Sequence, residues 1–152
     1  MIVYRKMVAE DVSQIAKLEA ICFSHPWREN AVAGELTNPL SLWLVAEEDG
    51  MIIGYVGSQS VLGEADMMNV AVLPAYRNQG IGRRLIEDLV AALNRNGVHC
   101  LTLEVRVSNI SAVHLYQNLG FLQVGRRPNY YSAPKEDALI LKKEWECENS
   151  GN

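Results

Sequence analysis

The chain has 152 residues, of which 49% are hydrophobic and 21% are charged, and its formal net charge is -4. These values are those of an ordinary globular protein and exclude a disordered or fibrous chain. The negative charge argues against a broad nucleic-acid-binding surface, although a basic protein segment could approach it. The length predicts one domain over residues 1–145, followed by a disordered tail over residues 146–152.

Neither a membrane segment nor a metal site is expected. No window approaches the roughly 18 consecutive apolar residues that span a bilayer, and residues 1–6 lead into polar sequence rather than a signal-peptide core. Cys22, Cys100 and Cys147 have no C-x-x-C spacing, which predicts reduced thiols instead of disulfides or a zinc site. The histidines are scattered without the short-range spacing of metal ligands. We therefore expect a cytoplasmic protein without a metal or a membrane partner.

In chain order, hydrophobic periodicity alternates between strand and helix patterns. A strand over residues 2–7 precedes a helix that starts at Glu10 and stops before Pro26, and a second short helix follows Trp27. The remaining patterns predict strands over 41–47, 51–61, 65–73, 101–107, 121–127 and 138–141, and helices over 81–93 and 112–119. This order, β-α-α-β-β-β-α-β-α-β-β, predicts an α/β fold with a mixed, largely antiparallel sheet flanked by helices.

An anion-binding site is predicted where the strand over 65–73 gives way to the next helix. Residues 77–82 read RNQGIG, and we call them the glycine loop. Free N–H groups and the positive end of a helix dipole meet here, and glycine allows an anion to approach the main chain. Positive charge comes from Arg77, Arg83 and Arg84. An ordinary helix start with solvated arginines explains the same residues equally well.

Two common nucleotide-binding motifs do not fit the glycine loop. A G-x-G-x-x-G motif that starts at Gly80 would need glycine at Leu85, and no G-K-S/T ending of a Walker motif occurs in the chain. Dinucleotide and nucleoside-triphosphate binding are therefore not expected.

What remains is R-x-x-G-x-G after a strand, together with N-x-x-A-x-x-x-Y-x-x-x-G-F over residues 109–121. With these two motifs the chain resembles the GCN5-related N-acetyltransferase (GNAT) superfamily. Four further segments, FSHPW at 23–27, LEVR at 103–106, NYY at 129–131 and EDA at 136–138, are similar to bacterial ribosomal-protein-alanine N-acetyltransferases of the RimI type. The resemblance covers nearly the whole chain and implies the GNAT fold.

The resemblance also implies a cofactor, acetyl-CoA, and the residues that bind it. In the family the glycine loop binds the pyrophosphate, main-chain amides of the preceding strand polarise the acetyl carbonyl, and an asparagine contacts the cofactor. The matching residues are Val70, Ala71, Val72, Arg77, Asn78, Gln79, Gly80, Ile81, Gly82, Arg83 and Asn109.

The catalytic roles implied by the resemblance fall on Glu104 as general base, directly or through water, and on Tyr116 as the acid that protonates the coenzyme A thiolate. From pattern alone, Glu104 is a solvated carboxylate on the polar face of a strand, and Tyr116 packs its ring on the apolar stripe of a helix. Asn109 also has the residue type of a helix N-cap, and both of its roles stay open.

Exposed aromatic residues in two segments are expected to bind the acceptor, although either segment could instead be part of a satellite core. They are Phe23, Pro26, Trp27, Tyr130 and Tyr131. An α-amine with a pKa near 8 needs about 1 kcal/mol to lose its proton at pH 7, whereas a lysine side chain needs roughly 4 to 5 kcal/mol, so a carboxylate base favours protein N-termini.

The resemblance implies the N-terminal alanine of small-subunit ribosomal protein 18 as acceptor, by direct transfer in a ternary complex. Two alternatives stay open: acetylation of lysine or of a small-molecule amine by the same fold, and a non-catalytic acyl-CoA-binding domain that serves a partner protein. No direct contact with nucleic acid is expected, and no oligomeric state is predicted.

Overall fold

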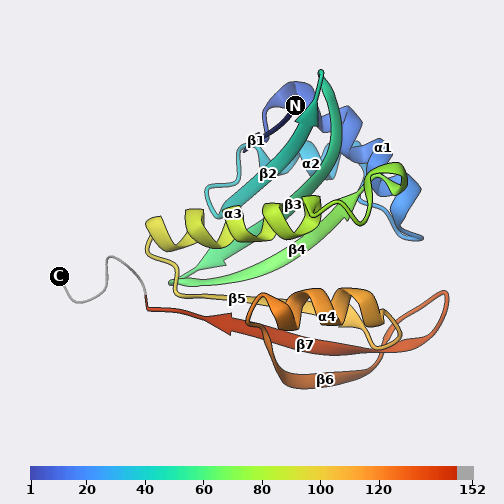
Figure 1. Ribbon diagram of the computed structural model, residues 1–152, viewed down its shortest axis with the longest axis vertical. Coiled ribbons are helices and arrows are strands. Elements are labelled where there is room, and N and C mark those ends of the chain that lie inside the picture. Colours follow the sequence, from blue (N-terminus) through green and yellow to red (C-terminus); the bar gives the residue numbers. More distant parts are fainter. Residues whose placement is uncertain (147–152) are drawn as a thin grey trace. The chain divides into compact units, whose positions relative to one another are not determined.

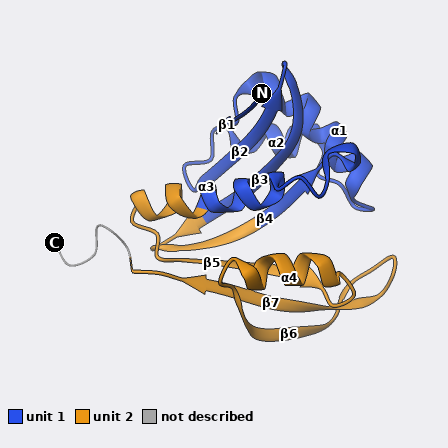
Figure 2. Ribbon diagram, in the orientation of Figure 1, with its two compact units in different colours: residues 1–59, 68–89 blue, residues 60–67, 90–152 orange. Residues whose placement is uncertain are grey.

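The computed structural model describes residues 1–146, which fall into two compact units (Figure 2). Unit 1 consists of Met1–Gln59 and Met68–Leu89, and unit 2 consists of Ser60–Met67 and the chain from Val90 onward. The predicted tail lies outside the described residues except for Glu146. A single domain over residues 1–145 stays a prediction.

The elements follow the predicted order (Figure 1). The strands are β1 (Ile2–Lys6), β2 (Ser41–Glu48), β3 (Met51–Val61), β4 (Glu64–Val72), β5 (Cys100–Arg106), β6 (Leu122–Tyr131) and β7 (Glu136–Glu144). The helices are α1 (Val12–Cys22), α2 (Glu29–Glu35), α3 (Ile81–Arg95) and α4 (Ile110–Asn118), with short 3-10 turns η1 (Ala9–Asp11) and η2 (Pro74–Tyr76). The seven strands have the order β1-β2-β3-β4-β5-β7-β6. The prediction of an α/β fold with a largely antiparallel sheet is confirmed.

In unit 1, β1, β2 and β3 pair antiparallel, and β3 separates two layers of side chains. Tyr55 lies in an apolar cluster with α1 and α2 residues such as Ile15 and Val32. Its neighbour Gly54 faces α3, because a Cβ added there would lie 3.3 Å from Leu85. Successive strand residues point to opposite faces, so α1 and α2 pack on one face of β3 and α3 packs on the other.

Aromatic rings fill the side of unit 1 that faces α1. Trp43 stacks on Tyr55 with centroids 5.5 Å apart, and Trp27 meets Trp43 edge-on at 5.4 Å. The Trp43 ring lies against Gly57, where an added Cβ would overlap the ring. These packed rings support the segment between α1 and α2.

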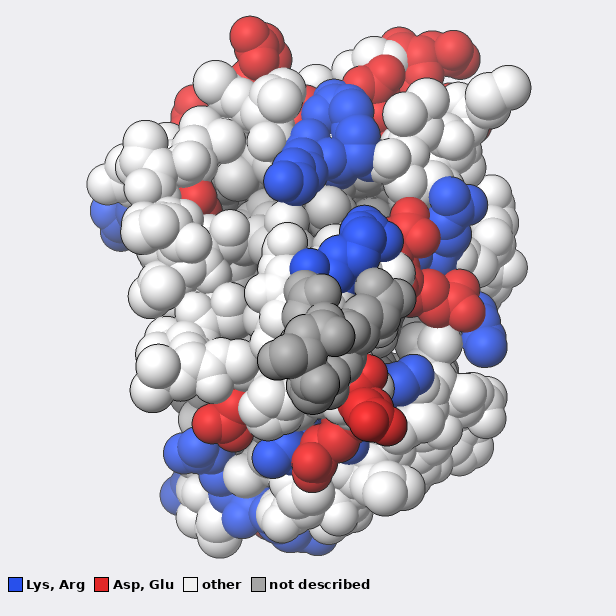
Figure 3. Space-filling view, turned by 90° about the vertical axis from the view of Figure 1, so that its left-hand side faces the viewer, with Lys and Arg blue, Asp and Glu red and all other residues white. Residues whose placement is uncertain are grey.

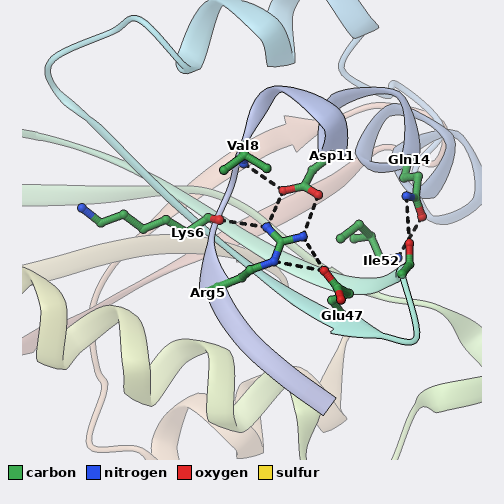
Figure 4. Close-up of polar contacts among 8 residues, drawn as sticks. Arg5, Lys6, Val8, Asp11, Gln14, Glu47 and Ile52 are labelled. Atoms are coloured by element: carbon green, nitrogen blue, oxygen red, sulfur yellow. Dashed lines mark hydrogen bonds and ion pairs between the residues drawn. The ribbon is translucent and has the colours of Figure 1, made fainter. Parts of the chain in front are cut away.

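A charged cluster fastens β1 to β2 and to the start of α1 (Figure 4). Arg5 donates to Asp11 at 2.7 and 2.9 Å and to Glu47 at 2.6 Å. Burial alone would raise the pKa of Asp11, but hydrogen bonds from Arg5 and from the Val8 N–H hold that pKa below its usual value. The ionised carboxylate of Asp11 therefore stabilises the folded unit.

In unit 2, Glu64, Ala65 and Asp66 of β4 pair in parallel with β5, and β5, β7 and β6 pair antiparallel in that order. Strand β6 is longer than the predicted strand over 121–127, because it passes through Pro128 and ends at Tyr131. Proline is tolerated because β6 is an edge strand, where a missing N–H interrupts no ladder on its outer side. The register shifts at this point, and Asn129 has a φ of 54°.

No helix within residues 1–146 has the length and apolar character needed to cross a membrane. On the face drawn in Figure 3, Lys and Arg side chains lie among Asp and Glu side chains, so both signs of charge are present.

Candidate active site

The glycine loop in unit 1 has the backbone geometry of an anion site. Asn78 and Gly80 have φ values of 63° and 81°, and α3 begins directly afterwards at Ile81. Left-handed residues in such a turn help to direct neighbouring N–H groups toward one side, which is an arrangement that can bind phosphates. Residues 77–80 are exposed, and a Cβ added at Gly80 would meet nothing within 4 Å. The main chain here fits a pyrophosphate group.

Arg77 is fixed by contacts within unit 1. Its Nε donates to the Val72 carbonyl at 3.2 Å, and its Nη2 lies 3.5 Å from the Cys22 sulfur. The guanidinium thereby joins the glycine loop to the end of β4 and of α1, and its charge stays exposed at the loop.

The next two arginines project from the first turn of α3 and pair along the helix. Arg83 lies 3.7 Å from Glu87, and Arg84 lies 3.0 Å from Asp88. Arg84 also covers the Tyr4 ring at 4.4 Å. Arg84 therefore has two partners within unit 1, whereas Arg83 has one long, exposed ion pair that an anion could replace.

Strand β4, which leads into the glycine loop, contributes main-chain groups as well as side chains to the candidate site. Ala71 is buried, Val70 and Val72 are half-buried, and the Leu73 N–H donates to Ile53 of β3 at 2.8 Å. The parallel register with β5 involves Glu64 to Asp66, while β4 itself continues to Val72.

In unit 2, Glu104 lies on the half-exposed face of β5, as the alternation predicted. Leu103 and Val105 are buried on the opposite face. The carboxylate lies 3.5 Å from the Arg127 guanidinium and accepts a hydrogen bond from the Tyr130 hydroxyl, which raises the pKa of Tyr130. A carboxylate with exchangeable, partly exposed partners can accept a proton from an incoming amine.

A rigid frame holds the tyrosine pair beside Glu104. The rings of Tyr130 and Tyr131 meet edge-on at 5.0 Å, and Arg106 covers Tyr131 at 4.4 Å. Arg106 is itself fixed by Glu136 at 3.1 Å. Burial, followed by the charge of Glu104, raises the pKa of Tyr131 to about 12. Tyr131 therefore stays neutral near pH 7.

Tyr116 and Asn109 occupy the places in α4 that the sequence indicated. Tyr116 is buried, its ring meets Phe121 edge-on at 5.7 Å, and burial raises the pKa of its hydroxyl to about 12. Asn109 is the N-cap, because its side-chain oxygen accepts from the Ala112 N–H at 3.2 Å. Both local interpretations are thus confirmed, and the roles that the resemblance adds stay predictions.

The segment at residues 23–27, which we call the aromatic turn, lies in unit 1. Phe23 and Trp27 are partly buried against the apolar cluster, while Pro26 is exposed. The turn is thus anchored to the core by its two large rings and presents the residues between them.

The structure groups the expected site residues by unit. The glycine loop, the end of β4 and the aromatic turn belong to unit 1, whereas Glu104, Tyr116, Tyr130 and Tyr131 belong to unit 2. Sequence reasoning missed Arg127 and Arg106, which hold the carboxylate and the tyrosine pair. It also missed Asp66, whose pKa is raised by burial and by the charges of Glu104 and Glu64. The sequence signals for the arginines were that Arg106 is the last residue of the LEVR segment and that Arg127 lies two residues before the NYY segment.

Known proteins resemble the chain in sequence and structure. The model of the acetyltransferase (GNAT) family matches residues 12–121. The ribosomal protein bS18-alanine N-acetyltransferase of Escherichia coli (strain K12) is 37% identical over 133 residues, which cover 86% of this chain and 89% of that protein. N-alpha-acetyltransferase RimI of Mycobacterium tuberculosis is 37% identical over 141 residues, which cover 88% of this chain and 87% of that protein.

Among solved structures, the crystal structure of the ribosomal-protein-S18-alanine N-acetyltransferase from Escherichia coli has a TM-score of 0.88 and 34% identity, with 98% of each chain covered. The family match spans most of the chain, and the relatives match over nearly their full length. The chain belongs to the GNAT family of acetyltransferases.

Proposed function

We propose that the protein transfers the acetyl group of acetyl-CoA to the N-terminal α-amine of a protein, specifically the N-terminal alanine of ribosomal protein bS18. The observation that carries this proposal is the similarity, over 98% of both chains, to the Escherichia coli enzyme of that name. Ribosomal substrate and enzyme would then meet in the cytoplasm.

The glycine loop is proposed to hold the cofactor. Its exposed N–H groups and the start of α3 bind the pyrophosphate, helped by Arg77 and Arg83. The main chain of Val70, Ala71 and Val72 polarises the acetyl carbonyl. The bound cofactor supplies an acetyl group already activated as a thioester.

Glu104 is proposed to take the proton from the incoming ammonium group, directly or through one water. The neutral amine then attacks the acetyl carbon, the carbon–sulfur bond breaks, and an amide forms. Because an α-ammonium has a pKa near 8, deprotonation at pH 7 costs only about 1 kcal/mol, which a carboxylate base can meet. Arg127, 3.5 Å away, is the charged partner of this carboxylate before the substrate binds.

Tyr116 is proposed to protonate the departing thiolate. Its pKa of about 12 keeps the phenol protonated at any working pH, so the acid is always in its active form. The substrate nitrogen loses two protons as the ammonium becomes an amide. Glu104 passes the first to solvent, and the second, lost as the carbon–sulfur bond breaks, restores the neutral hydroxyl of Tyr116. Atoms and charge balance, since one proton ends on the coenzyme A thiol and one is released.

Direct transfer is supported by the burial of Cys100, the cysteine that lies closest in sequence to Glu104. Cys100 is 1% exposed, and burial raises the pKa of its thiol. A buried neutral thiol is a poor nucleophile, which disfavours an acyl-enzyme route. A kinetic burst of coenzyme A that disappears in Cys100→Ser would contradict direct transfer.

The aromatic turn and the tyrosine pair are proposed to bind the acceptor peptide. Pro26 and Tyr130 are exposed, and Phe23, Trp27 and Tyr131 support them. Flat, rigid side chains of this kind form walls for an extended peptide.

The test is acetylation of a peptide panel. Peptides that begin with alanine, serine or methionine, and an N-terminally blocked peptide with an internal lysine, are incubated with enzyme and acetyl-CoA, and the product is located by mass spectrometry. We expect the alanine peptide to have the highest kcat/KM. Turnover of the lysine peptide alone would support the first alternative, and acetyl-CoA binding without any turnover would support a non-catalytic domain.

A further inference from the structure

Glu19 is a fully buried carboxylate that the proposed chemistry does not use. It belongs to α1 in unit 1 and is 0% exposed. One oxygen accepts from the Trp27 main-chain N–H at 2.8 Å, and the other accepts from Asn69 Nδ2 at 2.7 Å. Each carboxylate oxygen thus has one strong, charge-assisted partner, and the partners come from separate segments.

The first partner closes the aromatic turn on α1. The Glu19 carbonyl oxygen accepts from the Phe23 N–H at 2.9 Å, while its carboxylate accepts from the Trp27 N–H. The two ends of the turn are therefore fixed to one residue. The Trp27 ring adds a contact with Trp43, so the turn has little freedom to shift along α1.

The second partner ties the same residue to β4. Asn69 directly precedes Val70, the first of the residues proposed to polarise the acetyl carbonyl. One turn along α1, the Cys22 sulfur lies 3.8 Å from the Val72 carbonyl oxygen. Residues three apart on a helix share a face, so this face of α1 contacts β4 just before the proposed acetyl-binding residues, at Asn69, and at the last of them, Val72.

The chemistry of the site requires a carboxylate. Both partners are donors, so a side chain at position 19 must offer two acceptor oxygens. Burial raises the pKa of Glu19, and the two donated hydrogen bonds oppose that rise. An apolar side chain would avoid the cost of burying a charge, but it would leave the Trp27 N–H and the Asn69 amide without partners.

We propose that Glu19 is a positioning residue for the acceptor: it fixes the aromatic turn relative to residues 70–72 of β4, and thereby sets how far the first residue of a peptide reaches toward the acetyl group. The inference rests on the proposed function of these two segments. It predicts that changes at Glu19 alter the use of the peptide more than the binding of the cofactor.

The test uses a reversal of hydrogen-bond polarity. Glu19→Gln keeps the shape of the side chain, but its amide N–H group then faces one of the two donors, the Trp27 N–H or the Asn69 amide, and cannot accept a hydrogen bond from it. Combining it with Asn69→Asp restores both bonds, because the glutamine amide then donates to the carboxylate introduced at position 69. Glu35→Gln is the matched control, since Glu35 is 8% exposed and accepts from Gln59 and Asn38, away from the aromatic turn.

For Glu19→Gln we expect the KM for the alanine peptide to rise by roughly tenfold or more, as for a lost hydrogen bond to a charged group, with the Kd for acetyl-CoA unchanged. The double variant should recover most of the loss, and Glu35→Gln should show none of it. Hydrogen exchange over residues 23–28 should be faster in Glu19→Gln and slow again in the double variant.

Faster exchange with an unchanged peptide KM would overturn the inference, and so would equal effects of Glu19→Gln and Glu35→Gln. If Glu19→Gln does not fold, Asn69→Ala removes one of the two bonds at a less buried position and carries the same expectation. A wild-type enzyme that modifies only lysine peptides would refute the proposed function. The ratio of the peptide KM of Glu19→Gln to that of the wild type, measured with those lysine peptides, would still decide the role of Glu19.

Discussion

Replacing Tyr116 with phenylalanine removes one hydroxyl group and leaves the aromatic ring against Phe121. If the hydroxyl is the acid that protonates the thiolate, kcat should fall by about 10² to 10⁴, the usual contribution of general acid catalysis. The Kd for acetyl-CoA and the stability near pH 7 should change little, because ring packing is retained.

The same substitution tests the burial of the hydroxyl through stability. The pKa of Tyr116 is raised by burial to about 12, against an ordinary value of 10. Because the unfolded chain ionises this tyrosine at a lower pH than the folded protein does, stability is constant below about pH 10 and falls as pH rises through about 12, by about 2.7 kcal/mol in total. Roughly half of this loss should have occurred at pH 11.

Urea unfolding of wild type and Tyr116→Phe at pH 8 and pH 11 measures this difference, and steady-state kinetics measures the loss of kcat. Relative to Tyr116→Phe, the wild type should lose stability between the two pH values. A stability difference that is the same at both pH values would show that the hydroxyl is not buried as described, and an unchanged kcat would exclude Tyr116 as the acid.

Three further predictions concern the base, the glycine loop and the charged cluster. Glu104→Gln should lower kcat/KM for peptides by about 10² to 10⁴ and recover partly as pH rises and the free amine accumulates; a flat, wild-type-like profile would exclude it as base. Gly80→Ala and Gly50→Ala should each lower the free energy of unfolding by about 1 kcal/mol, because φ is 81° at Gly80 and 83° at Gly50. Only Gly80→Ala should also raise the Kd for acetyl-CoA, measured by calorimetry. Asp11→Asn should lower the free energy of unfolding by about 2 kcal/mol at pH 7. Because the native pKa of Asp11 lies below its ordinary value, the difference should shrink as pH falls below about 4 and vanish below the native pKa; a difference that persists there would refute the role of its charge.

The hydrophobic periodicity of the longer elements predicted the fold well. Four apolar residues on one face of α3 are buried, with Ile81, Leu85, Leu89 and Leu93 at most 2% exposed. A helix of this length buries one stripe whatever lies opposite, so its sequence alone contains the signal. The strand predicted from the sequence ended before Pro128, because proline usually ends a strand. Only the edge position of β6 explains why Pro128 is tolerated within it.

The contacts of the candidate site depend on information that local patterns lack. The alternation in β5 placed Glu104 correctly, but its partner Arg127 lies on β6, and the register through β7 brings the two together. Glu19 was missed for a different reason. It lies four residues after the buried Ile15, on the inner side of α1, and a carboxylate at such a position is read as surface until its two donors are known.

The central claim is the acetylation of an N-terminal α-amine, and one peptide tests it most directly. A peptide that begins with alanine and carries an internal lysine offers both amines at the same concentration to the same enzyme. After limited turnover with acetyl-CoA, fragmentation by tandem mass spectrometry locates the new acetyl group. We predict that it lies on the alanine nitrogen; an acetyl group on the lysine side chain would contradict the proposed function.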